Sequence, residues 1–257
     1  MIEHFLDLPA RRAKPRTTGL TMAIDSGLPT RLFADIVDSC AAHLDILKFG
    51  WGTALVTPDF AAKAELLRER DITFMFGGTL FEKFVSQDRL EQFIELCRQY
   101  GCRLVEVSNG TIDMSLASKA KFIAQIAEEF DVVAEVGYKD QPRSEMFSPS
   151  QWIDSIRSDL DAGAKFVILE ARESGSSGIC RPTGELRFGL LEDILSSGIH
   201  ADSLMFEAPT KTIQTYFVRR LGHEVNLGNI ALTDLIALET LRLGLRADTL
   251  LDDGLAE

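Results

Sequence analysis

The chain has 257 residues, 46% of them hydrophobic, and a formal net charge of −12. This length fits one large domain or two small ones with a sizeable buried core. The negative charge and the lack of a lysine- or arginine-rich block argue against nucleic acid as a partner, because its phosphates would be repelled over most of the surface.

The N-terminal segment contains early acidic residues and no long apolar run, which is not the pattern of a signal peptide. No stretch approaches the roughly 20 apolar residues that a membrane helix needs. The four cysteines form no CxxC pair, which argues against a zinc site or a redox dithiol. We therefore expect a cytoplasmic protein without a membrane partner.

Strand-like runs alternate with helical patterns along the chain. The predicted strands are short apolar segments at residues 18–25, 45–51, 73–78, 104–109, 132–137, 166–171, 203–208 and 224–229. The predicted helices carry apolar residues at helical spacing, at residues 30–43, 59–70, 87–100, 116–130, 150–162, 185–196, 211–221 and 231–243.

This alternation predicts an α/β protein with a single (β/α)8 TIM-type barrel. The domain covers residues 1–257, with 1–15 as an N-terminal extension and 245–257 as a C-terminal tail. The alternative is a doubly wound open sheet, which usually has a glycine-rich phosphate fingerprint after its first strand. Here the first predicted strand ends in Ile-Asp-Ser-Gly-Leu-Pro, so the barrel is favoured.

Glutamates occupy the same relative place in four successive predicted strands. They are Glu106, Glu135, Glu170 and Glu207. A buried carboxylate is costly unless it is paired, protonated or bound to a cation. Oxygen ligands suit Mg²⁺, and all four histidines lie outside the predicted strand ends. We therefore predict a magnesium site formed by these acids. The alternative for any one of them is an ion pair with Lys48, Lys139 or Arg172.

Basic and polar side chains follow the strands at the same rim, where barrels place their active sites. Lys48, Lys139 and Arg172 are candidate catalytic residues, and together with Lys211 they would surround a phosphate or carboxylate. The alternative for Lys211 is a solvated position in the first turn of a helix. The other candidates for substrate binding are Asp25, Trp51, Gly78, Thr79, Ser108, Asn109, Ser174, Asn226 and Asn229.

Three features near the predicted site each allow two interpretations. Trp51 is either a pocket wall or an outward packing residue. The Gly77–Gly78 pair is either part of the site or only a tight turn. The Gly175–Gly178 segment is either a lid beside Arg172 or a plain flexible loop.

Several longer segments together resemble the phosphosulfolactate synthase family over nearly the whole chain. They lie at residues 16–25, 48–53, 77–82, 105–110, 135–140, 170–175, 206–209, 225–230 and 238–249. Lys48-Phe-Gly-Trp-Gly-Thr53 and Glu170-Ala-Arg-Glu-Ser-Gly175 are among the more unusual ones. The chain departs from the pattern at Tyr138, where many relatives have a second lysine, and at Gly228, where many have alanine.

The resemblance implies a magnesium-dependent barrel lyase, a carbon–sulfur lyase that adds sulfite to phosphoenolpyruvate. Its product would be (2R)-phospho-3-sulfolactate, an early sulfonate of one route to coenzyme M. The resemblance also implies a homo-oligomer, such as a trimer, and assigns the family's catalytic lysine to Lys139. Some relatives, including plant heat-stress proteins, have no established synthase role, so membership alone does not decide the activity.

The expected mechanism begins with attack of sulfite on C3 of the enol phosphate. Magnesium would stabilise the enolate-type intermediate, and Lys139 would protonate C2, its pKa lowered toward neutrality by neighbouring cations. One alternative is another barrel lyase or an aldolase acting on a phosphorylated carboxylate, with a Schiff base at Lys139 or Lys48. Another is a non-catalytic stress-associated protein.

Overall fold

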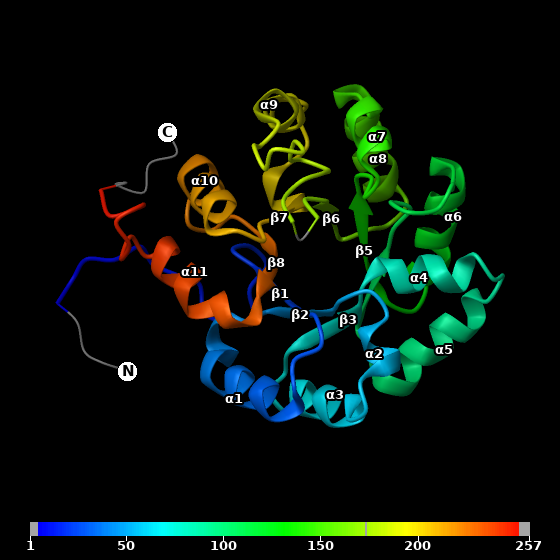
Figure 1. Cartoon of the computed structure of the whole chain (residues 1–257), viewed down its shortest axis with the longest axis horizontal. Coiled ribbons are helices and arrows are strands. Elements are labelled where there is room, and N and C mark those ends of the chain that lie inside the picture. The colour runs from blue at the N-terminus through cyan, green and yellow to red at the C-terminus, as the bar shows by residue number, and fades with distance from the viewer. Residues whose placement is uncertain (1–4, 173, 252–257) are drawn as a thin grey trace.

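The computed structural model describes residues 5–172 and 174–251, which form a ring of parallel strands surrounded by helices (Figure 1). The strands are β1 (Thr21–Asp25), β2 (Ile46–Phe49), β3 (Thr73–Phe76), β4 (Leu104–Val107), β5 (Asp131–Val136), β6 (Phe166–Leu169), β7 (Leu204–Glu207) and β8 (Leu227–Ala231). Their order in the sheet is β3-β2-β1-β8-β7-β6-β5-β4. β3 and β4 lie side by side, but in the described part of the chain no ladder joins them. The predicted barrel is confirmed, and it is nearly closed.

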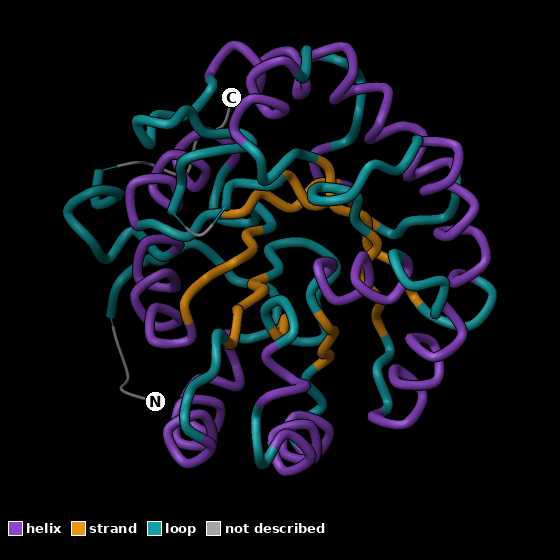
Figure 2. Tube along the Cα trace, turned by 45° about the vertical axis from the view of Figure 1, so that its right-hand side comes forward, coloured by secondary structure: helices purple, strands orange, loops and turns teal. Residues whose placement is uncertain are grey.

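The helices lie on the outer side of the strand ring (Figure 2). The α-helices are α1 (Thr30–Cys40), α2 (Thr53–Val56), α3 (Phe60–Glu69), α4 (Gly78–Val85), α5 (Leu90–Tyr100), α6 (Leu116–Ala127), α7 (Gln141–Met146), α8 (Pro149–Asp161), α9 (Phe188–Ser196), α10 (Lys211–Leu221) and α11 (Leu235–Arg242). The short 3-10 helices are η1 (Ala41–His43), η2 (Ala201–Ser203) and η3 (Leu232–Asp234).

Local capping fixes where several helices begin and end. The hydroxyl of Ser115 accepts a hydrogen bond from the backbone N–H of Ser118 at the start of α6. Ser148 and Gln151 form a capping box at the start of α8. α5 stops at Gly101, whose φ of 74° lies in the left-handed region that favours glycine.

Three helices were not predicted, several strands are shorter than predicted, and the last strand is displaced along the chain. The sequence patterns did not predict α2, α4 or α7, which are short helices in the loops that follow β2, β3 and β5. The last strand was predicted at residues 224–229 but occupies Leu227–Ala231. Asn226 therefore precedes β8 instead of standing at its carboxyl end.

The barrel interior holds a layer of apolar side chains beneath a layer of charged ones. The apolar layer consists of Leu20, Met22, Ile46, Met75, Leu104, Val133, Phe166, Ile168 and Met205. A second, larger cluster fills the space between the sheet and the helices. Alternate residues of a strand face the same side, so the next inward residue after each apolar one lies nearer the strand's carboxyl end.

Residues before β1 pack against the amino-terminal end of the barrel. Arg11 pairs with Glu224 and Glu239, and Lys14 donates to the backbone oxygens of Ala41 and Leu44. In the predicted C-terminal tail, the Thr249 hydroxyl is buried and donates to the Leu241 backbone oxygen. The rest of the predicted extension and tail includes residues 1–4 and 252–257, which lie outside the described residues.

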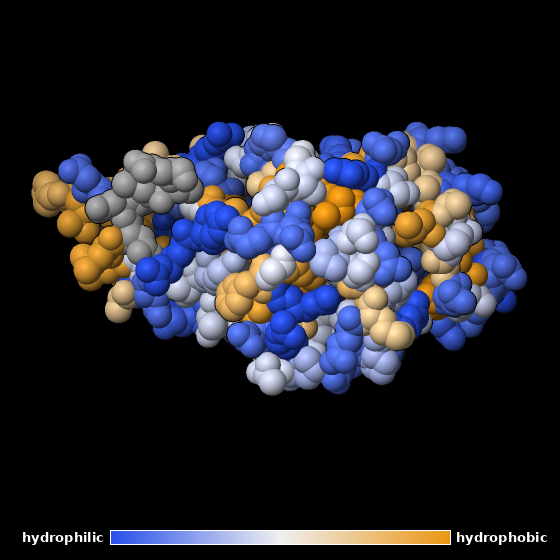
Figure 3. Space-filling model, turned by 90° about the horizontal axis from the view of Figure 1, so that it is seen from above, coloured by the Kyte–Doolittle hydropathy of each residue, from blue (hydrophilic) through white to orange (hydrophobic). Residues whose placement is uncertain are grey.

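The face seen in Figure 3 is mostly polar, and apolar side chains gather at the end where the chain termini lie. Phe5, Leu6, Leu250 and Leu251 are exposed large apolar side chains of the terminal segments. Among the described residues, no helix has both the length and the apolar character required to span a membrane.

We predict different costs for alanine at two glycines near the barrel interior. A Cβ at Gly228 would lie 2.7 Å from the flexible end of the Met22 side chain, which can move. A Cβ at Gly137 would lie 2.7 Å from Cβ of Glu170 and 2.8 Å from the Trp152 ring, and φ there is 129°. Gly228→Ala should cost less than about 1 kcal/mol, and Gly137→Ala at least about 2 kcal/mol. Urea unfolding checks both, and equal costs would contradict the packing described here.

Candidate active site

Five charged side chains form the layer above the apolar interior of the barrel. Each follows an apolar interior residue by two positions, as Glu106 follows Leu104 and Glu135 follows Val133. The remaining members of this layer are Glu170 after Ile168, Glu207 after Met205 and Lys48 after Ile46. All five are at most 4% exposed. The strand periodicity therefore carries the charges into the interior at the carboxyl ends of the strands.

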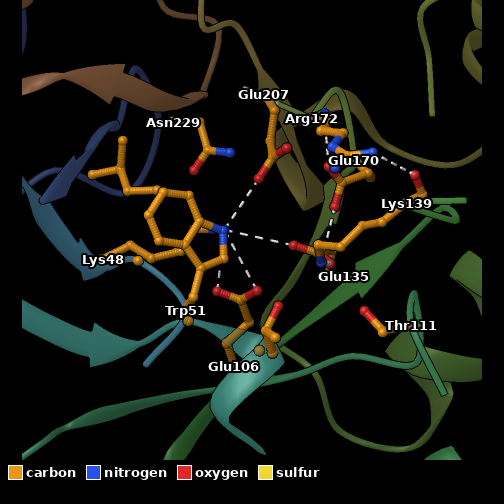
Figure 4. Close-up of a pocket in the computed structure, with 15 residues that line it drawn as sticks. Lys48, Trp51, Glu106, Thr111, Glu135, Lys139, Glu170, Arg172, Glu207 and Asn229 are labelled. Carbon is orange, nitrogen blue, oxygen red and sulfur yellow. Dashed lines mark hydrogen bonds and ion pairs between the residues drawn. The ribbon is translucent and has the colours of Figure 1, made fainter. Parts of the chain in front are cut away.

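The ammonium group of Lys48 lies among three of these carboxylates (Figure 4). Its Nζ is 3.2 Å from Glu106 Oε2, 3.1 Å from Glu207 Oε1 and 3.5 Å from Glu135 Oε2. Four strands thus meet at one ammonium group. In the protein without a bound metal, these glutamates form internal ion pairs with Lys48, which was the predicted alternative to a metal site.

A second lysine enters from the loop after β5. Lys139 Nζ is 2.5 Å from Glu135 Oε1 and 3.1 Å from Glu170 Oε2. Backbone N–H groups complete the arrangement, because Arg172 donates to Glu170 at 2.6 Å and Ala171 donates to Glu207 at 2.9 Å. Glu135 therefore links the two lysines.

Burial and neighbouring charges move the pKa values of these groups in opposite directions. Burial raises the pKa of Glu106 to about 8, despite the opposing effect of Lys48. Burial and Glu207 hold the pKa of Glu170 well above its usual value. Burial also tends to raise the pKa of Glu135, but Lys139 and Lys48 outweigh it, so that pKa is lowered.

The pKa of Lys139 differs from the prediction. Burial alone lowers it, but Glu135 and Glu170 raise it by more, so the pKa lies well above its usual value. The expected lowering toward neutrality is therefore wrong for the protein by itself, because the nearest charges are carboxylates and not cations. Lys139 carries its proton at neutral pH.

Three of the acids are arranged so that they could hold a metal ion. One carboxylate oxygen each from Glu135, Glu170 and Glu207 lies within 4.8 Å of the others, and all three residues are buried. The four interior glutamates outnumber the two lysines beside them, so full ionisation leaves an excess of negative charge. Oxygen-only donors and uncompensated charge fit a hard divalent cation.

The pocket above these acids has a volume of about 270 Å³. Trp51, Arg172 and Asn229 line it with φ values of 47°, 27° and 53°, a backbone region that non-glycine residues rarely adopt. Asn229 is 7% exposed, and its side-chain oxygen has no hydrogen-bond partner among the described residues. Strained residues that present side chains to a cavity are typical of binding sites.

The structure brings most of the predicted site residues together. Those that line the pocket are Lys48, Trp51, Gly78, Thr79, Glu106, Glu135, Lys139, Glu170, Arg172, Glu207 and Asn229. Trp51 forms part of the pocket wall, which was one of its two predicted roles. Gly78 also opens α4, and a Cβ there would lie 2.8 Å from Glu106 Oε1.

Three predicted substrate-binding residues instead fix loops near the pocket. Asp25 pairs with Lys63 at 2.5 Å and accepts hydrogen bonds from the N–H groups of Gly27 and Leu28. Ser108 donates to Glu82 at 2.5 Å, and Asn109 donates to the backbone oxygen of Met114. Their polar groups are used within the protein, because short polar side chains at strand ends readily bind nearby backbone and side-chain groups.

Three others lie away from the described pocket lining. Ser174 is exposed and contacts Ser176. Lys211 pairs with Asp248 at 2.7 Å, close to its predicted alternative as a surface residue. Asn226 donates to the backbone oxygens of residues 202 and 204 and accepts from the Leu20 N–H, because it precedes β8.

Sequence patterns missed two residues that shape the pocket. Glu82 of α4 is 1% exposed and accepts hydrogen bonds from the backbone N–H groups of Thr111 and Ile112. Thr111 in turn lines the pocket. Glu82 stands four residues after Gly78, on a helix that the patterns did not predict. The signal that could have found it is an acid next to the apolar pair Leu80 and Phe81, shortly after a predicted strand.

Comparison with known proteins identifies a family. The model of a family described as (2R)-phospho-3-sulfolactate synthase matches residues 9–248. The chain is 49% identical to a phosphosulfolactate synthase of Bacillus subtilis, over 97% of this chain and 99% of the relative. It is 38% identical to one of Methanothermobacter thermautotrophicus, over 94% and 95%. A heat-stress-associated protein of Arabidopsis thaliana is 22% identical over 84% and 83%.

Solved structures show the same fold at low identity. A 3-hexulose-6-phosphate synthase matches with a TM-score of 0.55 and 16% identity, over 86% of this chain and 98% of that one. The orotidine 5'-phosphate decarboxylase of Pyrococcus horikoshii matches with a TM-score of 0.54 and 11% identity, over 86% and 98%. These likenesses support the barrel architecture alone.

We predict that Glu106 makes stability depend on pH. Its folded pKa of about 8 lies above the ordinary value of 4.5, so the folded state binds more protons, and stability falls as pH rises between these values. Glu106→Gln removes this dependence. The free energy of unfolding of the variant, relative to that of wild type, should therefore rise by about 1 to 3 kcal/mol as the pH increases from 5 to 9.

Glu135→Gln is the matched control, because the pKa of Glu135 is lowered by Lys139 and Lys48. Its ionised form stabilises the fold above its ordinary pKa, so the variant should be less stable than wild type at pH 7. Urea unfolding at pH 5, 7 and 9 measures both. A Glu106→Gln profile parallel to wild type would contradict the assignment.

Proposed function

The chain belongs to the phosphosulfolactate synthase family, and on that premise we propose that it joins sulfite to phosphoenolpyruvate to form (2R)-phospho-3-sulfolactate. The observation that carries the proposal is the contact of Lys139 with Glu135 and Glu170, two of the three carboxylates that could hold Mg²⁺. The reaction needs both the lysine and the cation, because charge builds on the substrate carboxylate while a proton is delivered next to it.

The proposed step forms one C–S bond and one C–H bond. The sulfur lone pair of sulfite attacks C3, and the electron pair of the C2–C3 double bond moves toward the carboxylate. Lys139 then gives its proton to C2 and regains a proton from water. The proton donor must be charged before the step, and Glu135 and Glu170 raise the pKa of Lys139 above its usual value. A cation held by these carboxylates would lower that pKa again and make Lys139 a stronger acid.

Glu135, Glu170 and Glu207 would hold Mg²⁺. The bound ion would supply positive charge opposite the substrate carboxylate. Lys48, which is 4% exposed and surrounded by acids, would keep the carboxylates in place rather than contact substrate. Arg172 is exposed at the pocket, and its guanidinium donates to the Lys139 backbone oxygen, so we assign it to an anionic substrate group.

The geometry favours this reaction over an aldolase with a Schiff-base lysine. Such a lysine must be a neutral amine, whereas carboxylates raise the pKa of both Lys48 and Lys139 above the opposing effect of burial. Borohydride in the presence of substrate would trap a Schiff base, and a covalent adduct at either lysine would favour the aldolase.

We predict that the protein, incubated with sulfite, phosphoenolpyruvate and Mg²⁺, forms an adduct with the mass of phosphosulfolactate. Exhaustive chelation should abolish product formation, and added Mg²⁺ should restore it, because the three carboxylates would supply the oxygen donors that this ion prefers. Mass spectrometry with a time course measures the product. Unchanged turnover after chelation would contradict the metal requirement, and absence of product with all three components would contradict the reaction.

We predict that Lys139→Ala lowers the rate by roughly a hundredfold to ten-thousandfold, the usual span of general acid catalysis. Binding of phosphoenolpyruvate should persist, because Arg172 and the metal site remain. Lys165→Ala is the control, since Lys165 is exposed and pairs with Asp131, a residue that begins β5 at the other end of the strand. If Lys139→Ala kept a normal rate but bound substrate weakly, Lys139 would bind an anionic group of the substrate and would not be the proton donor.

A further inference from the structure

A buried ion pair lies behind β5, between the sheet and two helices. Lys119 from α6 and Asp159 from α8 are both 0% exposed, and their Nζ–Oδ2 distance is 2.6 Å. The same ammonium group donates to the backbone oxygen of Glu135 at 2.6 Å. Glu135 is the residue whose carboxylate links Lys48 and Lys139.

The end of β4 explains why Glu135 takes a side-chain donor. The ladder between β4 and β5 ends with the pair Val107 and Ala134. Beyond it the chain leaves the sheet at Ser108, which is held by Glu82. The Glu135 carbonyl lies one residue past the last pair, where Lys119 supplies the hydrogen bond. A buried carbonyl without a donor would be costly.

The contribution of the Lys119–Asp159 pair to folding stability does not by itself explain why a charged pair is buried behind β5. Replacing a buried ion pair with apolar side chains of similar volume is often neutral or stabilising. Asp159 Oδ1 also lacks a hydrogen-bond partner among the described residues, so the pair is incompletely satisfied. What an apolar pair could not do is donate to Glu135.

We propose that Lys119 is a positioning residue for the site. By binding the Glu135 carbonyl, its ammonium group fixes the end of β5 and thereby the carboxylate that contacts both pocket lysines. The carboxylate–ammonium contact of 2.5 Å between Glu135 and Lys139 leaves little tolerance for movement of the strand end. Asp159 acts through Lys119 by holding that ammonium group in place.

The chain contains a matched control on another side of the barrel. Lys63 of α3 is 1% exposed, pairs with Asp25 at 2.5 Å and donates to the Leu28 backbone oxygen. This pair has the same chemistry and burial, but its backbone contact is to the loop after β1 and to none of the four glutamates. Lys63→Met and Lys119→Met each leave one buried aspartate unpaired, so both should lower the midpoint of urea unfolding.

The experiment compares the full-length wild type with Lys119→Met, Lys63→Met and the double variant Lys119→Met/Asp159→Leu, which removes both charges if the single variant does not fold. One readout is the crystal structure around Glu135. The other is kcat and KM with sulfite, phosphoenolpyruvate and Mg²⁺, and only this readout rests on the proposed function. We expect kcat to fall about tenfold to a hundredfold in the Lys119 variants, with KM changed less than about threefold. In Lys63→Met kcat should fall less, because Asp25 holds a loop near the pocket and none of the four glutamates.

The Glu135–Lys139 contact should lengthen or be lost in the Lys119 variants and persist in Lys63→Met. An unchanged contact in a folded Lys119 variant would overturn the inference, as would an equal loss of kcat in Lys63→Met. A wild-type protein that forms no product would instead sink the proposed function. The crystal structures would then still decide the role of Lys119.

Discussion

The interior of this barrel is organised around the ammonium group of Lys48, which meets carboxylates from β4, β5 and β7. Each of these charges would be costly to bury alone, and removing one partner of such a group usually costs far more than its net contribution to stability. The acids and Lys48 therefore fix one another. The strands that carry them must therefore end at the same height in the barrel. This common height sets the position of the pocket floor.

The four interior glutamates carry more charge than the two lysines can neutralise, and this excess of negative charge favours binding of a cation. Lys48 and Lys139 neutralise part of the charge of four glutamates, and the protein responds with a raised pKa at Glu106 and Glu170. A divalent cation bound by these carboxylates would favour their ionised forms. A site of this kind is poised to exchange protons for a metal, since metal ligands must be deprotonated.

Much of the fold and the acidic layer could be predicted from the sequence, because strands alternate inward and outward with period two and a glutamate after an apolar interior residue is conspicuous. The contacts that Asp25, Asn226 and Lys211 make within the protein could not be predicted in this way. Their polar groups are used by Lys63, by backbone oxygens near β7 and by Asp248, which depends on contacts that the sequence pattern does not show. Lys119 and Glu82 were missed for the converse reason, since they reach the site from helices.

A diffraction experiment on crystals soaked in Mn²⁺, whose anomalous scattering marks its position, tests whether a divalent cation binds among the interior carboxylates. We predict one strong peak bound by oxygens of Glu135, Glu170 and Glu207, with Lys48 still beside Glu106. A peak bound by other residues, or no peak at the carboxyl ends of β5 to β7 at saturating Mn²⁺, would contradict the claim that a divalent cation balances the charge of this site.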